Sequence, residues 1–419
     1  MLDLFRRITT QSRQASYLLA ITSVYVLAGM AYSFWWPPLV RHRTFYWLIP
    51  HDIWLTVRDS HWIAWGGLSS VYSAGTSLIT LPGYSIVLLP VVLLSSGLNL
   101  SEGSPPLHVL IGHQTAWLIV GPFMLASVGP ALFALNALAV ELHLSQGRRR
   151  ILTLAAAAAM WPTIAIWGHP EDVLAFAFVV YALLAAYRGR TTRAAWLFGI
   201  AAALQLWVVM LLPIALGLAG VRRTIPFLLR AAVIPGFFFF AVVIPDPTTS
   251  LRILVDQPLY PGVNHPTPWE LVAPHLADHH VAGGLGHLIA LAAAILAGIW
   301  VAKRQPRLDR VLWLSAVVLV LRCEFEAVMI PYFVMPAAVL LLLLAAYRGL
   351  GHLAALSVLV LGLLCMVQTH HDMWNYWLLM TGILGACLVI ARPPVSADRP
   401  ITLDTGSDAT TIGPIRAIT

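Results

Sequence analysis

Chemically capable side chains gather in one short stretch of this sequence, residues 50–66, which reads PHDIWLTVRDSHWIAWG within a chain otherwise rich in leucine, alanine and valine. Read as a helix, the stretch places Asp52 and Asp59 on one face, seven residues apart. Carboxylates that are free to point into a cavity make this stretch a candidate reaction site, with Asp52 and Asp59 as candidate catalytic residues. The opposite face is aromatic and basic, as suits a membrane interface, and carries Trp54, Arg58, His61 and Trp65. The alternative is an ordinary solvated helix beside a membrane.

Composition restricts the class of protein. Of the 419 residues, 59% are hydrophobic and 10% are charged, which is too little charged surface for a water-soluble chain of this length. Backbone groups in lipid must be satisfied within their own segment, and the apolar runs lack the alternation of barrel strands. We therefore predict an all-α polytopic integral membrane protein with roughly 11–13 transmembrane or re-entrant helices.

Charge and cysteine usage exclude other classes. The net charge of +7 comes from short basic clusters between apolar runs, so it reports topology and does not indicate nucleic-acid binding. The cysteines, Cys323, Cys365 and Cys387, lie in or beside apolar segments without the spacing of a metal site. They are expected to be small core residues.

The basic clusters also orient the chain. Arginines precede the first apolar run, so the amino terminus is expected in the cytoplasm of a multi-pass protein of the cell membrane. Residues 1–391 are predicted to form a single transmembrane domain with two long external loops, 39–83 and 246–283. The polar tail, 392–419, is expected to be disordered cytoplasm.

Two segments between these landmarks are ambiguous. Residues 109–127 and 129–144 are predicted as separate spans, divided by glycine and proline. The segment 194–219 is basic at both ends and holds Gln205 near its middle. We expect two half-length helices that enter part way and return, with a single span as the alternative.

The predicted topology places the remaining unusual polar residues on the external side. The candidate substrate-binding residues are Arg58, His169, Glu171, Asp172, His265, Trp269, Arg322, Glu326 and His371. Charged groups in a span are costly, so Arg322 and Glu326 are expected to face a wet cavity or each other; their i, i+4 spacing also permits a plain ion pair. His371 has the alternative role of a solvated interfacial imidazole. No spacing matches a known ligand set, so no metal is predicted.

Several short motifs resemble those of a known family. Asp52-Ile53-Trp54 is followed by Gly66-Gly67, Val71-Tyr72 and Leu81-Pro82-Gly83, and a second motif reads Gly168-His169-Pro170-Glu171-Asp172. The arrangement resembles the C-type superfamily of membrane glycosyltransferases, in particular the actinobacterial enzymes that use polyprenyl-phosphate mannose. The second motif is similar to the Gly-Gln-x-Asn segment of related mannosyltransferases, with His and Asp in place of Gln and Asn. The basic residue that follows in those relatives is replaced in this chain by Gln205.

The resemblance implies a function. A sugar, with mannose favoured, moves from a polyprenyl-phosphate donor to a glycolipid or glycan acceptor on the extracytoplasmic face, with no further cofactor. Asp52 best matches the family's acidic catalytic residue, while Asp59 competes as base or orients the acceptor. Arg58, Arg322 and His371 are candidates to bind the phosphate leaving group. Membrane lipid is the other expected partner.

Two other functions remain open from the sequence. A transporter or flippase of lipid-linked sugars also keeps charges in a cavity, but it should place them near the middle of the membrane. A catalytically inactive envelope-assembly partner keeps the fold and tolerates loss of Asp52.

Overall fold

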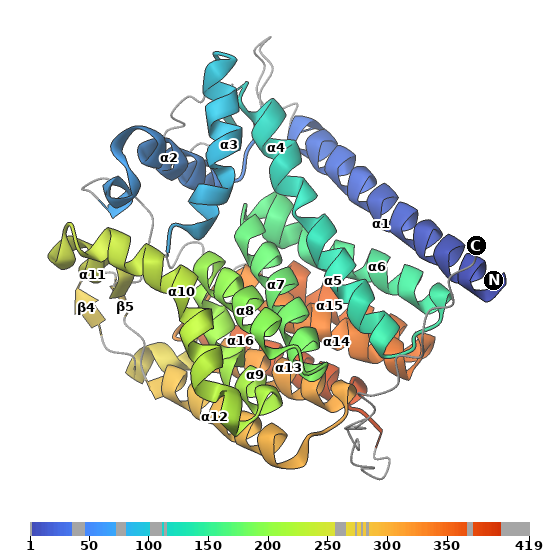
Figure 1. Cartoon of the computed structure of the whole chain (residues 1–419). Coiled ribbons are helices and arrows are strands. Elements are labelled where there is room, and N and C mark those ends of the chain that lie inside the picture. Colours follow the sequence, from blue (N-terminus) through green and yellow to red (C-terminus); the bar gives the residue numbers. More distant parts are fainter. Residues whose placement is uncertain are drawn as a thin grey trace, which may run out of the picture.

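Helices dominate the structure, a computed structural model that describes residues 2–35, 47–72, 81–100, 111–112, 115–255, 265–272, 275–277, 280–281, 285–366 and 372–394 (Figure 1). The first half holds α1 (Leu2–Trp35), α2 (His51–Gly66), α3 (Gly83–Gly97), α4 (Trp117–Ala126), α5 (Val128–Glu141), α6 (Gln146–Trp161), α7 (Pro170–Tyr187) and α8 (Thr191–Leu204). The second half holds α9 (Leu212–Ala219), α10 (Thr224–Val243), α11 (Pro247–Val255), α12 (Leu285–Arg304), α13 (Leu308–Phe325), α14 (Met335–Arg348), α15 (Leu350–Met366) and α16 (Met373–Ile390). The predicted all-α class is confirmed.

Short elements connect these helices. The helical turns are η1 (Leu68–Tyr72), η2 (Pro162–Ile166), η3 (Leu206–Leu211), η4 (Val221–Arg223), η5 (Pro268–Val272) and η6 (Pro331–Val334). Short antiparallel strands pair β1 (Trp47–Leu48) with β2 (Ile111–Gly112), β3 (His265–Pro266) with β6 (Val328–Met329), and β4 (His275–Ala277) with β5 (His280–Val281). These pairs connect loop segments to one another, and within the described residues each is a separate two-stranded sheet.

Helix α1 runs antiparallel to α4 and α5. Towards the carboxyl end of α1, Ser33 Oγ accepts a hydrogen bond from Trp117 Nε1 at 3.1 Å. Towards its amino end, Gln14 Nε2 donates to Asn136 Oδ1 at 3.3 Å. The chain therefore returns to the level of its amino terminus by the end of α5.

Helices α4 and α5 follow each other as one nearly continuous helical run. Only Ser127 separates α4 from α5, and its backbone is helical, so residues Trp117–Glu141 form one apolar run of 25 residues. The expected division between 109–127 and 129–144 is therefore not seen in the described residues of these segments. Pro130 falls in the first turn of α5, where proline's missing N–H and fixed φ are tolerated and do not end the helical run.

Arginines from distant parts of the chain meet at one end of the helical bundle, which we call the basic end. Arg148 Nη1 and Arg307 Nη2 both donate to Tyr347, to its carbonyl and its hydroxyl, at 3.3 and 2.7 Å. Arg188 pairs with Glu141 there. The basic end joins the turns between α5 and α6, α7 and α8, and α12 and α13 to the end of α14, as the charge pattern predicts.

The segment around Gln205 turns back on itself. Helix α8 ends where Gln205 adopts an extended backbone with φ −151° and ψ 129°, and η3 and α9 follow. Arg223, just beyond α9, donates from Nη1 to the carbonyl of Gly189, just before α8, at 3.4 Å. Both ends of 194–219 therefore lie at the basic end, as the expected returning pair of helices requires; how this segment sits in a membrane stays a prediction.

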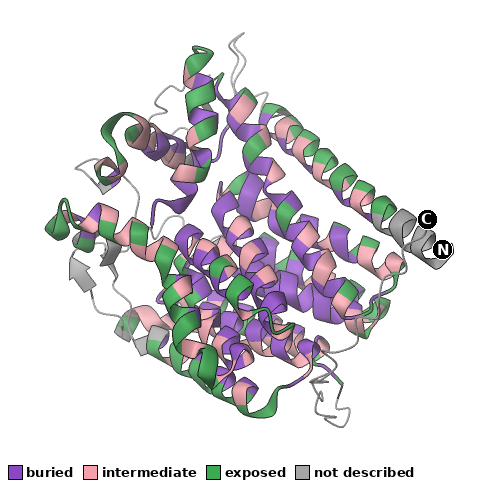
Figure 2. Cartoon of the chain, in the orientation of Figure 1, coloured by how far each residue is buried: buried purple, intermediate pink, exposed green. Residues whose placement is uncertain are grey.

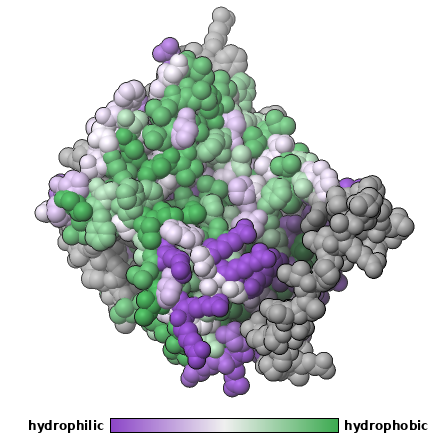
Figure 3. Space-filling view, in the orientation of Figure 1, coloured by the Kyte–Doolittle hydropathy of each residue, from purple (hydrophilic) through white to green (hydrophobic). Residues whose placement is uncertain are grey.

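The apolar helices form one buried core with lipid-like surfaces around it. Among the described residues, five helices are long and apolar enough to cross a membrane: Ser12–Phe34, Trp117–Glu141, Pro170–Tyr187, Val221–Val243 and Met373–Ile390. Figure 2 shows burial concentrated in the central helices, whereas α1 and α10 expose much of their length. Figure 3 shows a largely hydrophobic face with hydrophilic residues gathered in its lower middle. The protein is thus a polytopic membrane protein; the number of spans and their direction across the membrane stay predictions.

Candidate functional site

The site begins at two helix amino termini that carry acids in their first turns. Asp52 lies in the first turn of α2, and Glu171 and Asp172 lie in the first turn of α7. Carboxylates are stabilised there by the positive end of the helix dipole. Pro170 starts α7, because its fixed φ suits the first helical position and its missing N–H needs no partner there. The amino termini of α2 and α7 can therefore be predicted from the residues next to them in the sequence.

A glycine brings the two helix starts together. Gly168 has φ +78°, and a Cβ added there would lie 2.7 Å from Pro50 Cβ and 2.9 Å from the backbone nitrogen of Ile53. Only a residue without a side chain fits in this conformation at this distance. The close approach seats the start of α2 against the segment that precedes α7.

His169 joins the two carboxylates across this contact. Its Nε2 lies 2.9 Å from Asp52 Oδ2 and its Nδ1 lies 2.5 Å from Glu171 Oε1. Donation to both oxygens requires a proton on each ring nitrogen. Burial alone would lower the pKa of His169, but the charges of Glu171 and Asp52 and their hydrogen bonds outweigh it and raise the pKa well above its usual value. The two carboxylates therefore favour the doubly protonated, cationic form of His169.

The accessibility of the bridged groups differs. The Asp52 side chain is 38% exposed, whereas those of His169 and Glu171 are 13% and 10% exposed. The Tyr332 ring of η6 lies on the imidazole with centroids 3.8 Å apart, a contact that favours the cationic ring. Asp52 is thus the member of this group that a substrate can reach most readily.

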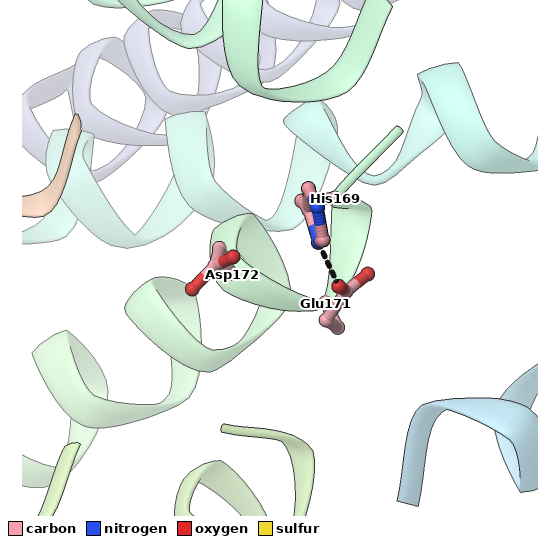
Figure 4. A group of neighbouring side chains, drawn as sticks. All are labelled: His169, Glu171 and Asp172. Carbon is pink, nitrogen blue, oxygen red and sulfur yellow. Dashed lines mark hydrogen bonds and ion pairs between the residues drawn. The ribbon is translucent and has the colours of Figure 1, made fainter. Parts of the chain in front are cut away.

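Figure 4 shows Asp172 on the other side of the first turn of α7 from the interacting pair His169 and Glu171. Its Oδ1 accepts a hydrogen bond from Trp207 Nε1 at 2.7 Å, and Gln205 Nε2 approaches its Oδ2 at 3.5 Å. The turning point of the returning segment therefore meets the start of α7. Asp172 is buried and interacts electrostatically with Arg322 of α13.

Arg322 and Glu326 form the ion pair that their spacing permits. Arg322 Nε lies 3.3 Å from Glu326 Oε1, and the two side chains are 9% and 8% exposed. The guanidinium also lies over the Phe333 ring, 4.0 Å from its centroid. Arg322 is thus a buried cation between Glu326 and the cluster at α7.

The second predicted loop is fastened beside this pair. Thr267 donates from its hydroxyl to the carbonyl of Glu326, and its backbone N–H donates to the carbonyl of Ala327 at 3.0 Å. The Trp269 ring lies 4.8 Å from that of Phe325 in an edge contact. The backbone of His265 in β3 pairs with Met329, so this candidate also belongs to the same region. His371 lies outside the described residues.

Asp59 and Arg58 are placed differently. Asp59 is 1% exposed, and its Oδ1 has no hydrogen-bond partner among the described residues. Burial raises its pKa to about 7, although the neighbouring charge of Arg58 lowers it. Seven residues along α2 put Asp59 about 10 Å beyond Asp52. The structure therefore joins Asp52, and not Asp59, to His169.

Three residues of this site were not among the predicted site residues: Trp207, Tyr332 and Gln205. Gln205 carried a visible signal, because an amide inside an apolar run needs a polar partner. The aromatic residues carried none, since Trp and Tyr are common throughout this chain.

The cluster also has donors for a cation. His169, Glu171 and Asp172 each offer a ligand atom, and these atoms lie within 4.8 Å of one another. Carboxylate and imidazole donors suit divalent ions. The absence of a metal stays a prediction, as does the absence of a further cofactor.

No protein-family model matches this sequence, and no curated protein shows significant similarity to it.

Proposed function

We propose that this protein is a membrane glycosyltransferase that moves a sugar, with mannose favoured, from a polyprenyl-phosphate donor to a glycolipid or glycan acceptor. The active site is proposed to open on the extracytoplasmic face. The observation that supports this most strongly is the partly exposed carboxylate of Asp52, fixed by the buried imidazole of His169.

The reaction needs a base and a place for the leaving group. The acceptor oxygen attacks the anomeric carbon of the donor, its proton passes to the Asp52 carboxylate, and the bond from that carbon to the phosphate oxygen breaks. The electron pair leaves with the phosphate. His169 contributes as a positioning residue, because its hydrogen bond fixes Asp52 through Oδ2.

The leaving phosphate requires cationic stabilisation. Arg322 is held on a helix and buried, so its position is defined more firmly than that of a surface arginine. A planar guanidinium can contact two phosphate oxygens at once. We propose that Arg322 supports the phosphate end of the site, with Glu326 keeping it oriented.

The distribution of charge favours transfer over transport. The ionisable residues of this site lie at the ends of α2, α7 and α13, whereas a transporter of lipid-linked sugars should hold them near the middle of its spans. A catalytically inactive assembly partner is distinguished by the experiment below.

The proposal is tested with membranes containing the full chain and radiolabelled polyprenyl-phosphate mannose or arabinose, scored for labelled lipid or glycan. Asp52→Asn should abolish transfer, because it removes the base and keeps the side-chain shape; we expect a loss of at least about 100-fold. Asp246→Asn is the matched control, since Asp246 is an exposed carboxylate beyond α10.

Two outcomes would count against the proposal. If Asp52→Asn retains activity within roughly tenfold of the parent, Asp52 is not the base. If folded parent protein forms no labelled product from either donor, the transfer of these sugars is refuted.

A further inference from the structure

The basic end of the molecule contains a cavity that the proposed transfer does not use. Its volume is about 980 Å³, and it lies between the start of α8 and the start of α10. Helix α7 has 18 residues, so the cavity lies about 27 Å along that helix from His169. It is therefore a separate place on the protein.

Arginines line this cavity without acidic partners. The lining includes Arg190, Arg193, Arg223 and Arg230, and it contains no aspartate or glutamate. Arg223 donates to the carbonyl of Gly189, and Arg230 donates to the carbonyl of Pro226 on its own helix at 3.3 Å. Within the part of the chain that the structure describes, the guanidinium groups of Arg190 and Arg193 have neither a hydrogen bond nor an ion pair.

The position of these arginines at the start of α8 further favours the binding of an anion in the cavity. The first turn of α8 contains Arg193 and no acid, so the arginine charge adds to the positive end of the helix dipole. Like charges held around one concave space repel one another and concentrate a positive potential there. A bound phosphate group would relieve that repulsion through charge-assisted hydrogen bonds.

Apolar side chains line the cavity beside the arginines, and α10, which forms part of its lining, also has an exposed apolar face. Trp196, 40% exposed, and Phe227 line the cavity together with Leu197 and Ile200. The adjoining face of α10, a helix long and apolar enough to cross a membrane, exposes Ile225, Leu229 and Val233 at 70%, 67% and 50%. Tryptophan beside arginine at a helix end is typical of the level of lipid headgroups.

From this combination we propose that the cavity binds the phosphate headgroup of an anionic membrane phospholipid. The phosphate contacts Arg190 and Arg193, and the acyl chains lie along Trp196 and the exposed face of α10. Basic pockets between membrane helices bind anionic headgroups in this way. This site is independent of the transferase proposal, because it involves none of the residues around Asp52.

The test uses the purified full chain in a neutral detergent, with binding measured by native mass spectrometry and thermal shift. Phosphatidylglycerol is compared with phosphatidylcholine, and inorganic phosphate is a separate arm. The parent should bind and be stabilised by phosphatidylglycerol only. Arg190→Gln with Arg193→Gln should weaken that binding about tenfold or more, because charge-assisted contacts are lost.

Matched variants keep the outcome interpretable. Arg222→Gln removes an exposed arginine next to the cavity that does not line it, and should bind as the parent does. Should the double glutamine variant fail to fold, Arg190→Lys with Arg193→Lys keeps the charge and should show a partial loss, because lysine lacks the bidentate fork.

Phosphatidylglycerol binding that is equal in the parent and the double glutamine variant would overturn the proposal. Equal binding of inorganic phosphate and of the lipid would overturn the lipid as the occupant and assign the cavity to a soluble phosphate.

Discussion

At the scale of single residues, the two aspartates of α2 have different environments although both belong to the same helix. Asp52 is partly exposed and bound to His169, whereas Asp59 is buried with an oxygen that lacks a partner among the described residues. A buried carboxyl without compensation favours its neutral form. The proposed base is therefore Asp52, and Asp59 should influence stability more than transfer.

Asp59→Asn tests this difference through pH. The folded-state pKa of about 7 lies above the usual 3.8, so the stability that Asp59 contributes is complete below pH 3.8 and is lost as pH rises through about 7. The whole difference is at most about 4 kcal/mol. Asp59→Asn should therefore gain thermal stability relative to the parent between pH 5 and pH 8, in detergent melts, while keeping transfer activity.

Asp246→Asn, an exposed change, should show no such pH-dependent gain. Loss of transfer in a folded Asp59→Asn protein would instead identify Asp59 as the base.

Arg322 gives a second test at this scale. Arg322→Ala leaves Glu326 buried without its nearest cation, which should lower the free energy of unfolding by up to about 3–5 kcal/mol. Adding Glu326→Gln removes the buried charge, so folded yield and melting temperature should recover. If Arg322 also supports the leaving phosphate, the recovered double variant should still fail in transfer. Full recovery of transfer would limit Arg322 to a structural ion pair.

At the scale of elements, the site depends on how the start of α2 lies against the segment before α7. That contact relies on Gly168, where backbone conformation and lack of space both exclude a side chain. The starts of the helices follow from proline and acidic residues nearby in sequence, but their mutual position is set by this one close approach.

Gly168→Ala should separate the two helix starts. Alanine costs about 1–2 kcal/mol in the left-handed region, and crowding against Pro50 and Ile53 should add about 1–3 kcal/mol. Gly220→Ala is the matched control, because Gly220 also has a positive φ of +82° but nothing within 4 Å of an added Cβ. Melting temperatures and transfer rates of both variants provide the measurement. Equal losses in the two would show that the contact with α2 is unimportant.

At the scale of the whole molecule, the polar residues separate into two ends. The bridged carboxylates and Arg322 lie at one end of α7, and the arginines of the basic end lie at the other. The charge rule for membrane proteins predicts that the basic end lies in the cytoplasm and the site outside.

Cysteine labelling tests this orientation. In a Cys365→Ser background, which removes the exposed native thiol, Thr249→Cys on α11 should react with a membrane-impermeant maleimide in intact cells. Arg222→Cys at the basic end should react only after lysis. The reverse pattern would put the proposed active site in the cytoplasm.

The sequence by itself determined the features that depend on local chemistry. Apolar runs without strand alternation require helices in lipid, the basic clusters meet at one end, and the polar Gln205 marks a turn within an apolar segment. It also indicated Asp52, His169 and Glu171 separately, because such groups are rare in an apolar chain. The sequence motifs that contain these residues did not reveal which of the side chains are in contact.

Only the tertiary structure decided the pairings. Asp52 and His169 are 117 residues apart, and Asp172 and Trp207 are 35 apart, so no helical periodicity relates them. The tertiary structure was also needed to show that α4 and α5 follow each other without a break, since Pro130 is compatible with either a break or the first turn of a helix. Asp52 and Asp59 share a face of α2, yet neighbouring segments from elsewhere in the chain give one carboxylate a partner and bury the other, because burial and hydrogen bonding are properties of the packed molecule.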